Sequence, residues 1–161
     1  MTSIISSMTV AQVQALTGSQ IAALATSDAN ALSNAQVGGL LTTQIPYLSA
    51  ADIVEISTAA ITAFNSSQIP YLTTKDVAAL TAAQVSVLTT AQVQALSTAQ
   101  VNALTTTEVA TFAPMLTGGQ LGLIGSAQAS GLTATALGNV STSNLPSLSN
   151  AALGAFTSVQ V

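Results

Sequence analysis

The sequence predicts an all-α solenoid of very short helices, one for each copy of an eight-residue repeat. The tract TTKDVAAL-TAAQVSVL-TTAQVQAL-STAQVNAL-TTTEVATF shows the period over residues 73–112. In this octad, position 8 is large and apolar, position 5 is apolar, position 1 is mostly Ser, Thr or Asn, and position 4 is mostly Gln or an acid. Such fixed spacing predicts that every octad forms the same small structural unit.

Positions 1 and 4 of the octad match a helix capping box, in which a hydroxyl and a Gln or Glu side chain satisfy each other's backbone N–H groups. Position 8 of one octad and position 5 of the next match a hydrophobic staple. A helix of about six residues is therefore expected in every octad. One long helix is disfavoured, because eight residues advance about 800° and the apolar stripe would drift by about 80° per octad. A β-solenoid is the alternative, since Thr and Val are abundant.

A single octad cannot fold alone, because two buried apolar side chains do not offset the entropy of ordering eight residues. Octads must therefore stack on one another, which is the energetic basis of a solenoid. The frame covers residues 1–112 as fourteen octads, is interrupted by four residues at 113–116, and resumes over 117–161. We expect two solenoid segments, separated by a phase shift at 113–116, within one continuous domain.

A second period of 24 residues relates Gln44–Leu48 to Gln68–Leu72. It predicts three octads per superhelical turn, although duplication of 24-residue blocks would leave the same pattern. Asp28, Asp52 and Asp76 share the spacing and would form a column of like charges. This column is a candidate calcium site, but each carboxylate is also explained as the acidic residue of a helix start.

The composition excludes several classes of function. The chain has no His and no Cys, and Lys75 is its only basic residue, for a net charge of −4. One Lys cannot neutralise a phosphate backbone, so nucleic acid is not an expected partner. Thiolate and imidazole metal sites, and the usual base for a Ser nucleophile, are also missing. We expect no enzyme activity, no catalytic residues and no cofactor. No apolar run is long enough to predict a transmembrane segment.

The predicted function follows from the ends of the octad pattern. It begins within the first residues and still runs at the last, so both ends are expected to expose apolar surface. A heterologous contact that does not close gives a filament. We therefore predict a structural subunit of a self-assembling extracellular filament, sheath or surface layer, polymerising head to tail. The predicted self-assembly residues are Met1, Ile4, Ile5, Met8, Leu153, Phe156 and Val161.

Two alternative functions fit the same sequence. The chain could be a stalk or spacer region of a cell-surface adhesin. It could also be a scaffold whose Thr, Ser and Gln faces bind a cell-surface glycan or ice.

The tract LTTAQVQALSTAQVNALTT at residues 88–106 resembles the Leu-Thr-Thr-Ala-Gln-Val repeats of large secreted and cell-surface proteins of Gram-negative bacteria. The likeness is strongest over residues 72–112 and thinner towards the C-terminus. The resemblance implies a bacterial protein that is extracellular or on the cell surface. It implies no particular activity.

Overall fold

The computed structural model describes residues 4–160, and over that range all regular structure is helical, with no strand. The α-helices are four to seven residues long. The prediction of an all-α solenoid of very short helices is confirmed, and the alternative of a β-solenoid is wrong. The chain divides into two compact units, residues 1–92 and residues 93–161, and each is described by itself.

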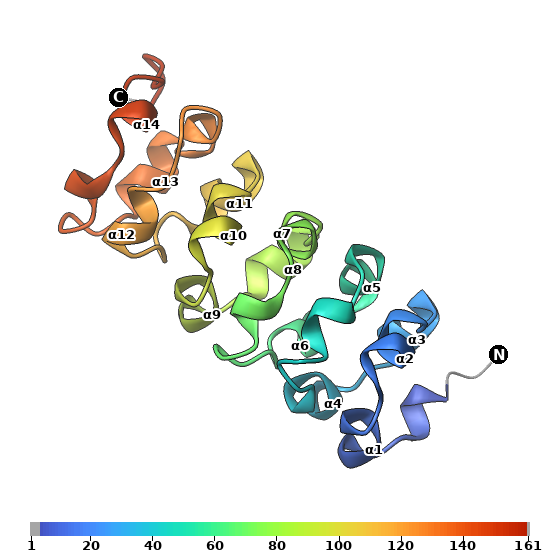
Figure 1. Cartoon of the computed structure of the whole chain (residues 1–161). Coiled ribbons are helices and arrows are strands. Elements are labelled where there is room, and N and C mark those ends of the chain that lie inside the picture. Colours follow the sequence, from blue (N-terminus) through green and yellow to red (C-terminus); the bar gives the residue numbers. More distant parts are fainter. Residues whose placement is uncertain (1–3, 161) are drawn as a thin grey trace. The chain divides into compact units, whose positions relative to one another are not determined.

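Each unit is a run of short helices joined by tight turns (Figure 1). Helix α9 (Thr90–Gln94) spans the boundary between the two units. The N-terminal unit contains the 3-10 helices η1 (Ile5–Ser7), η2 (Ile45–Tyr47) and η3 (Ile69–Tyr71), and the α-helices α1 (Val10–Gln14), α2 (Gly18–Ala22), α3 (Thr26–Asn30), α4 (Asn34–Gly39), α5 (Ala50–Glu55), α6 (Thr58–Ile61), α7 (Thr74–Ala78) and α8 (Ala82–Val87). The C-terminal unit contains α10 (Thr98–Asn102), α11 (Thr106–Phe112), α12 (Gly118–Leu121), η4 (Ala129–Gly131), α13 (Ala134–Gly138), η5 (Leu145–Ser147) and α14 (Asn150–Leu153).

The capping box restarts the helix in most octads. In α8, the Gln84 backbone N–H donates to Thr81 Oγ1 at 3.2 Å, and the Thr81 backbone N–H donates to Gln84 Oε1 at 2.9 Å. Thr81 has an extended backbone, with φ −70° and ψ 157°, so the chain turns sharply before each helix. The predicted role of positions 1 and 4 is confirmed by the same reciprocal pair at Thr9/Gln12, Thr17/Gln20, Ser33/Gln36, Ser49/Asp52, Thr73/Asp76, Thr89/Gln92, Ser97/Gln100, Thr105/Glu108 and Thr117/Gln120.

Octads with proline at position 6 form a 3-10 turn instead of an α-helix. Pro46, Pro70 and Pro146 lie in η2, η3 and η5. Proline has no N–H to donate, and a 3-10 turn tolerates this because its closing bond comes from position 8. In η2 the Leu48 N–H donates to the Ile45 carbonyl at 3.1 Å.

The core of each unit is built from positions 5 and 8. Val37, Ile53 and Val77 at position 5 are fully buried, and Leu48 and Ile56 at position 8 are nearly so. In the N-terminal unit, α1 packs on α4, α4 on α6, α6 on α8, α3 on α5, and α5 on α7. Each pair joins octads three apart in the sequence, so the helices of successive superhelical turns lie against one another. In the C-terminal unit, α11 packs on η4 and α12 on η5.

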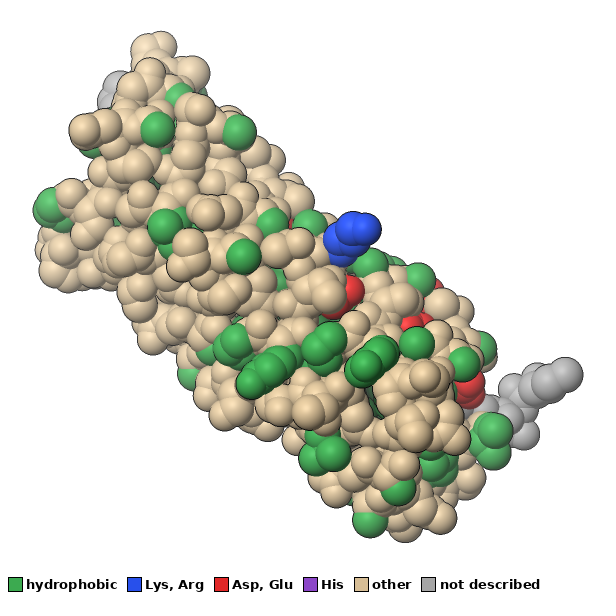
Figure 2. All heavy atoms as spheres, in the orientation of Figure 1, with side chains coloured by type: hydrophobic (Ala, Val, Ile, Leu, Met, Phe, Trp, Pro, Cys, Tyr) green, Lys and Arg blue, Asp and Glu red, His purple; other side chains and the backbone are tan. Residues whose placement is uncertain are grey.

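The visible molecular face in Figure 2 is mostly uncharged and polar, with small separate groups of apolar side chains and sparse charges. Within residues 4–160, no helix has the length and apolar character that a membrane span requires.

Candidate functional site

The glutamine at octad position 4 joins successive turns of the superhelix. Gln84 is only 2% exposed. Its Oε1 atom caps its own helix, while its Nε2 atom donates to the carbonyl oxygens of Ile53 at 2.6 Å and Ile56 at 2.8 Å. Those two carbonyls belong to positions 5 and 8 of the fourth preceding octad. One buried amide therefore satisfies the start of its own helix and the end of a helix one turn earlier.

The same bonds recur throughout the N-terminal unit and set the number of octads per turn. The helices pack on octads three apart, whereas the glutamines bond to octads four apart. The superhelix therefore has between three and four octads per turn, which refines the predicted value of three. The pairs are Gln36 with Ile5 and Met8, Gln44 with Val13 and Leu16, Gln68 with Val37 and Leu40, and Gln92 with Ile61 and Phe64.

A second set of bonds runs in the opposite direction along the chain. Gln14 Nε2 donates to the Gly39 carbonyl at 2.7 Å, and Asn30 Nδ2 donates to the Glu55 carbonyl at 3.0 Å. In both cases an amide at position 6 reaches position 7 of the third following octad, 25 residues later. The octads of Gln14 and Asn30 are thus each tied to the third following octad by a side-chain amide at position 6.

Residues 113–116 form the back half of an octad, which we call the half octad. Ala113 and Leu116 are buried like positions 5 and 8, and Pro114 corresponds to the prolines at position 6. Beyond it, Gln120 Nε2 donates to the carbonyls of Val93 and Leu96, which lie 27 and 24 residues back instead of 31 and 28. The four missing residues are those that the half octad lacks. The half octad therefore counts as one full repeat unit of the superhelix, and we call the space that one such unit fills a place.

Two further bonds support this count of places. Gln94 Nε2 donates to the Met115 carbonyl at 3.2 Å across 21 residues, four fewer than in the N-terminal unit. Gln160 has no half octad between itself and its partners. Its Nε2 atom donates to the carbonyls of Ala129 at 2.6 Å and Leu132 at 3.0 Å, again 31 and 28 residues back.

Carboxyl groups replace the glutamine amide at three buried positions. Asp52, Asp76 and Glu108 are 3%, 2% and 2% exposed. Each carboxylate accepts the capping N–H, as glutamine does, but an ionised carboxylate has no hydrogen to donate.

Burial raises the pKa of two of these carboxyls. Desolvation raises the pKa of Asp76, hydrogen bonds from Thr73 oppose that rise, and the charge of Asp52 adds to it. Burial likewise raises the pKa of Glu108, against hydrogen bonds from Thr105. Glu108 Oε2 accepts the Thr105 N–H at 2.6 Å, whereas the buried Oε1 atom has no partner in the described part of the chain.

The predicted calcium column is not assembled as a metal centre. Asp28, Asp52 and Asp76 lie on α3, α5 and α7, which pack in succession. Among the described residues, however, no group of three or more acidic, His or Cys side chains could hold a metal ion. The structure therefore does not bring the three aspartates into one cluster.

In the octads at residues 9–24, two glutamine side chains have Nε2 donors without an acceptor among the described residues. Gln12 and Gln20 are exposed, and their Oε1 atoms accept the Thr9 and Thr17 N–H groups at 2.8 Å. No carbonyl of residues 4–160 accepts a hydrogen bond from either Nε2 atom.

The predicted self-assembly residues near the start of the chain differ in exposure. Ile4 is 79% exposed and Met8 is half-buried. Ile5 is buried, at 2% exposure, because it occupies a core position, and its carbonyl accepts from Gln36. Ile5 therefore does not belong to an exposed surface. Met1 lies outside the described residues.

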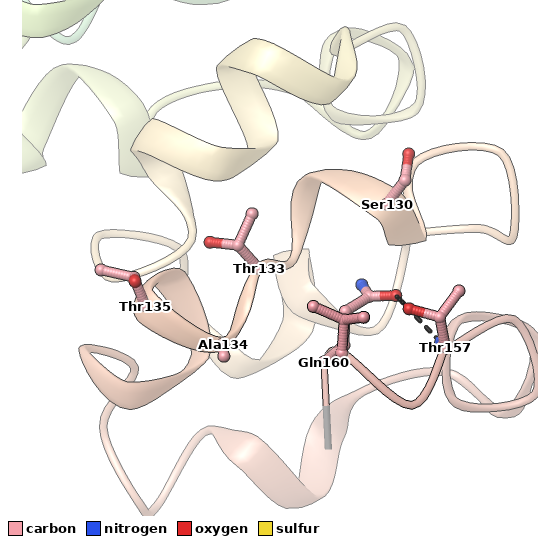
Figure 3. A pocket seen from close by; sticks show the side chains of 7 residues that line it. Ser130, Thr133, Ala134, Thr135, Thr157 and Gln160 are labelled. Atoms are coloured by element: carbon pink, nitrogen blue, oxygen red, sulfur yellow. Dashed lines mark hydrogen bonds between the residues drawn. The ribbon is translucent and has the colours of Figure 1, made fainter.

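The predicted self-assembly residues near the end of the chain also differ in exposure. Leu153 at position 5 is 49% exposed, in contrast to the buried residues at this position in the interior, and Phe156 is half-buried. Val161 lies outside the described residues. A hollow of about 420 Å³ opens beside residues 157–160 (Figure 3). It is lined by Ser130, Thr133, Ala134, Thr135, Thr157, Val159 and Gln160.

These features define the class of the protein as a helical-repeat solenoid held by buried glutamine amides. The family model described as ALTTAQ repeat matches residues 47–82 and 72–106, which identifies a repeat tract in the middle of the chain. A comparison with curated proteins finds no significant match. A comparison with solved structures finds none either.

Proposed function

We propose that the protein is a structural subunit that self-assembles head to tail into a filament, sheath or surface layer. One observation carries the proposal: within residues 4–160, octads 9–24 and octads 141–156 expose opposite halves of the contact that joins turns in the interior. The first octads offer the exposed amides of Gln12 and Gln20. The last octads offer main-chain carbonyls at positions 5 and 8 that accept no side-chain amide among the described residues.

Surfaces of this kind favour an open polymer. The two faces are different and complementary, so the contact between copies is heterologous, and such a contact extends without limit unless its rotation closes a ring. Charged side chains are only 4% of the sequence, so electrostatic repulsion between copies is weak. The exposed Leu153 adds apolar area to the face of the last octads.

We propose a structural role and not a catalytic one. The sequence lacks His and Cys, and the buried carboxyls of Asp52, Asp76 and Glu108 are already used as helix caps. The extracellular setting of the polymer is a further part of the proposal, supported by the resemblance of the LTTAQV tracts to repeats of bacterial secreted and surface proteins.

Light scattering and negative-stain microscopy of the purified chain test the proposal. We expect particle mass to grow with concentration and the images to show filaments or sheets. A monodisperse monomer at every concentration would overturn self-assembly and favour an adhesin stalk or a glycan- or ice-binding scaffold.

A pair of matched variants locates the surface that assembles. Leu153→Glu places a charge on the face of the last octads, and we expect it to raise the concentration needed for assembly about tenfold or more. Val54→Glu changes a similarly exposed apolar residue, 41% exposed, in the middle of the N-terminal unit, and should leave assembly unchanged.

A further inference from the structure

We propose that the N-terminal unit binds a neutral, extended polysaccharide, with the rings of Tyr47 and Tyr71 as the surfaces on which sugar rings stack. The two side chains are half exposed, at 50% and 49%. A tyrosine ring has apolar faces and a polar hydroxyl, which suits a sugar ring with C–H faces and hydroxyl edges. This binding is separate from the proposed self-assembly, and a monomer would have it as well.

The two tyrosines have equivalent positions on neighbouring turns of the superhelix. Each is the last residue of a 3-10 turn, η2 or η3, and the pentapeptide Gln-Ile-Pro-Tyr-Leu is the same in both. Their octads are three apart, which is the separation at which helices of this unit pack on one another. Equivalent positions on packed helices are about 8–10 Å apart. This distance is comparable with the length of a disaccharide, so one extended chain can reach both rings.

The fold does not require an aromatic ring at this position. The turn η5 also has proline at position 6, but it has Ser147 at position 7. A Cβ atom on Gly118 would collide with Ser147 Oγ, at 2.7 Å. A Cβ atom on Gly18 would likewise collide with the ring of Tyr47. Serine therefore contacts the equivalent glycine three octads earlier, and tyrosine adds exposed aromatic surface that the turn does not need.

The contact with Gly18 orders the ring of Tyr47. The ring lies in the space that a side chain at residue 18 would fill, so part of it packs on α2 and the rest faces solvent. A side chain that is ordered beforehand loses less conformational entropy on binding. Within residues 4–160, the hydroxyl groups of Tyr47 and Tyr71 have no hydrogen-bond partner. They are therefore available to the hydroxyls of a sugar.

The charges of the two octads favour an uncharged partner. Octads 41–48 and 65–72 contain no charged side chain, and neither does the octad of α2, on which η2 packs. The same octads expose hydroxyl groups, among them those of Thr43 and Ser66. A phosphate or carboxylate polymer would need a cluster of cations, and Lys75 is the only basic residue of the chain.

The exposed apolar area is too small for a stable contact with another protein. A completely covered aromatic side chain buries about 150–250 Å², so two half-exposed rings offer about 200 Å². Leu41, in the octad of Tyr47, is 44% exposed and adds a smaller area. A stable protein interface needs about 800 Å² per partner. A narrow linear ligand that contacts one ring after the other fits this area better.

Tyrosine fluorescence tests the proposal directly. The chain has two tyrosines and no tryptophan, so its tyrosine emission comes from the proposed binding surface alone. The probes are three neutral β-linked sugars, cellohexaose, chitohexaose and mannohexaose, and one anionic sugar of the same length, hexagalacturonate. We expect a saturable change in emission with a neutral sugar and none with the anionic one. No change with any neutral sugar, or equal binding of hexagalacturonate, would overturn the proposal.

Matched variants locate the binding. Tyr47→Ser and Tyr71→Ser introduce the residue that η5 has at this position, so both variants should fold, which circular dichroism checks. By calorimetric titration, we expect each to weaken binding about tenfold and the double variant to lose it. Val54→Ser removes a similarly exposed apolar side chain, 41% exposed, from the same unit and should change the affinity less than twofold.

The remaining outcomes separate this inference from self-assembly. A double tyrosine variant that binds as the wild type does, or a Val54→Ser variant that loses as much affinity, would overturn the assignment to the tyrosines. Light scattering of the double variant tests the other occupant. We expect its assembly to be unchanged. Loss of assembly in this variant, without sugar binding by the wild type, would assign the surface to a second copy and overturn the inference.

Discussion

Gln68 in the N-terminal unit and Gln120 in the C-terminal unit make the same bonds over different lengths of chain. Gln68 donates to carbonyls 31 and 28 residues back, and Gln120 to carbonyls 27 and 24 residues back. Both side chains are buried, and both cap their own octad. The number of places between a glutamine and the octad that accepts its hydrogen bonds is therefore the same in both units, whereas the number of residues between them differs.

The half octad shows which part of the repeat defines a place. It keeps positions 5 to 8, which supply the two buried side chains and the two carbonyls that accept an amide, and it lacks the capping half. Preceding it, α11 is the longest helix in the described chain, with seven residues, and the Ala113 N–H continues its hydrogen bonding to Val109 at 2.9 Å. A missing cap is thus tolerated where the previous helix runs on into the half octad.

Truncating the buried glutamines should give the largest loss of stability. The loss should be similar in the two units if the glutamine bonds to the octad four places earlier stabilise both. We expect Gln68→Ala and Gln120→Ala to lower the free energy of unfolding by about 3 kcal/mol each, because each leaves the carbonyl at position 8 of the partner octad and a capping N–H unpaired. Gln12→Ala loses only a cap and should cost about 1 kcal/mol. Urea unfolding measures all three. A cost for Gln120→Ala no greater than for Gln12→Ala would contradict the equivalence of the units.

Glycine substitutions test the register across the half octad. A Cβ atom on Gly131 would collide with the backbone carbonyl of Thr106, which lies three places earlier but only 25 residues back. We expect Gly131→Ala to cost about 2 kcal/mol or more, since backbone cannot move aside cheaply. The equivalent collision in the N-terminal unit, of Gly39 with Val10, involves a movable side chain, so Gly39→Ala should cost less.

A control for these substitutions lies in α12. A Cβ atom on Gly119 would meet only Thr117 Oγ1, at 3.9 Å and without a clash, so Gly119→Ala should stabilise the helix by about 0.5 kcal/mol. Thermal unfolding of the three variants gives the order. Equal costs for Gly131→Ala and Gly119→Ala would show that the two octads do not approach as described.

Replacing Glu108 by glutamine compares a buried carboxyl with the amide that most octads have at position 4. Because burial raises the pKa of Glu108, the folded state holds its proton more tightly than the unfolded state. The contribution of this group to stability is therefore greatest below the ordinary carboxyl pKa and is lost as the pH rises through the raised value. We expect Glu108→Gln to stabilise the protein by about 1–2 kcal/mol at neutral pH and by little in acid.

The pH dependence is measured by unfolding the wild type and Glu108→Gln between neutral pH and acid. Asp76 should give the same trend, because burial also raises its pKa. Curves that run parallel at every pH would rule out the assigned effect of Glu108.

Completing the half octad should have the smallest effect. Inserting Thr-Thr-Ala-Gln between Phe112 and Ala113 restores eight residues without adding a place. We expect the stability to change by less than about 1 kcal/mol, and Gln120 to retain its bonds to Val93 and Leu96 over the normal 31 and 28 residues. Hydrogen exchange of the C-terminal unit measures this. A general loss of protection there would show that the stacking depends on the number of residues between bonded octads and not on the number of places.

The local structure could be predicted from the sequence because its signals lie within eight residues. The hydroxyl and amide of the capping box, and the staple residues at positions 8 and 5, act between near neighbours. The 3-10 turns differ from the helix expected in every octad, and proline at position 6, which has no N–H to donate, was the available signal for them.

The packing of turns could not be predicted, because octads three and four apart are chemically alike. The 24-residue period pointed to three octads per turn, whereas the actual arrangement lies between the third and fourth neighbour. The donor role of the glutamine Nε2 atom was missed for a related reason. Either Gln or Glu completes a capping box, so the preference for Gln at position 4 was the available signal that a hydrogen is also needed.

Gln36 is the first residue in the described chain whose side chain joins its octad to the one four places earlier, and Gln14 finds its acceptor in the same octad, at Gly39. Any segment of this repeat can thus form capping bonds within single octads, but a bond between turns forms only when about thirty residues are ordered together. Folding must pay this closure entropy before the first such bond forms, and every later octad adds bonds at a far smaller cost. The array should consequently fold by slow nucleation and rapid growth.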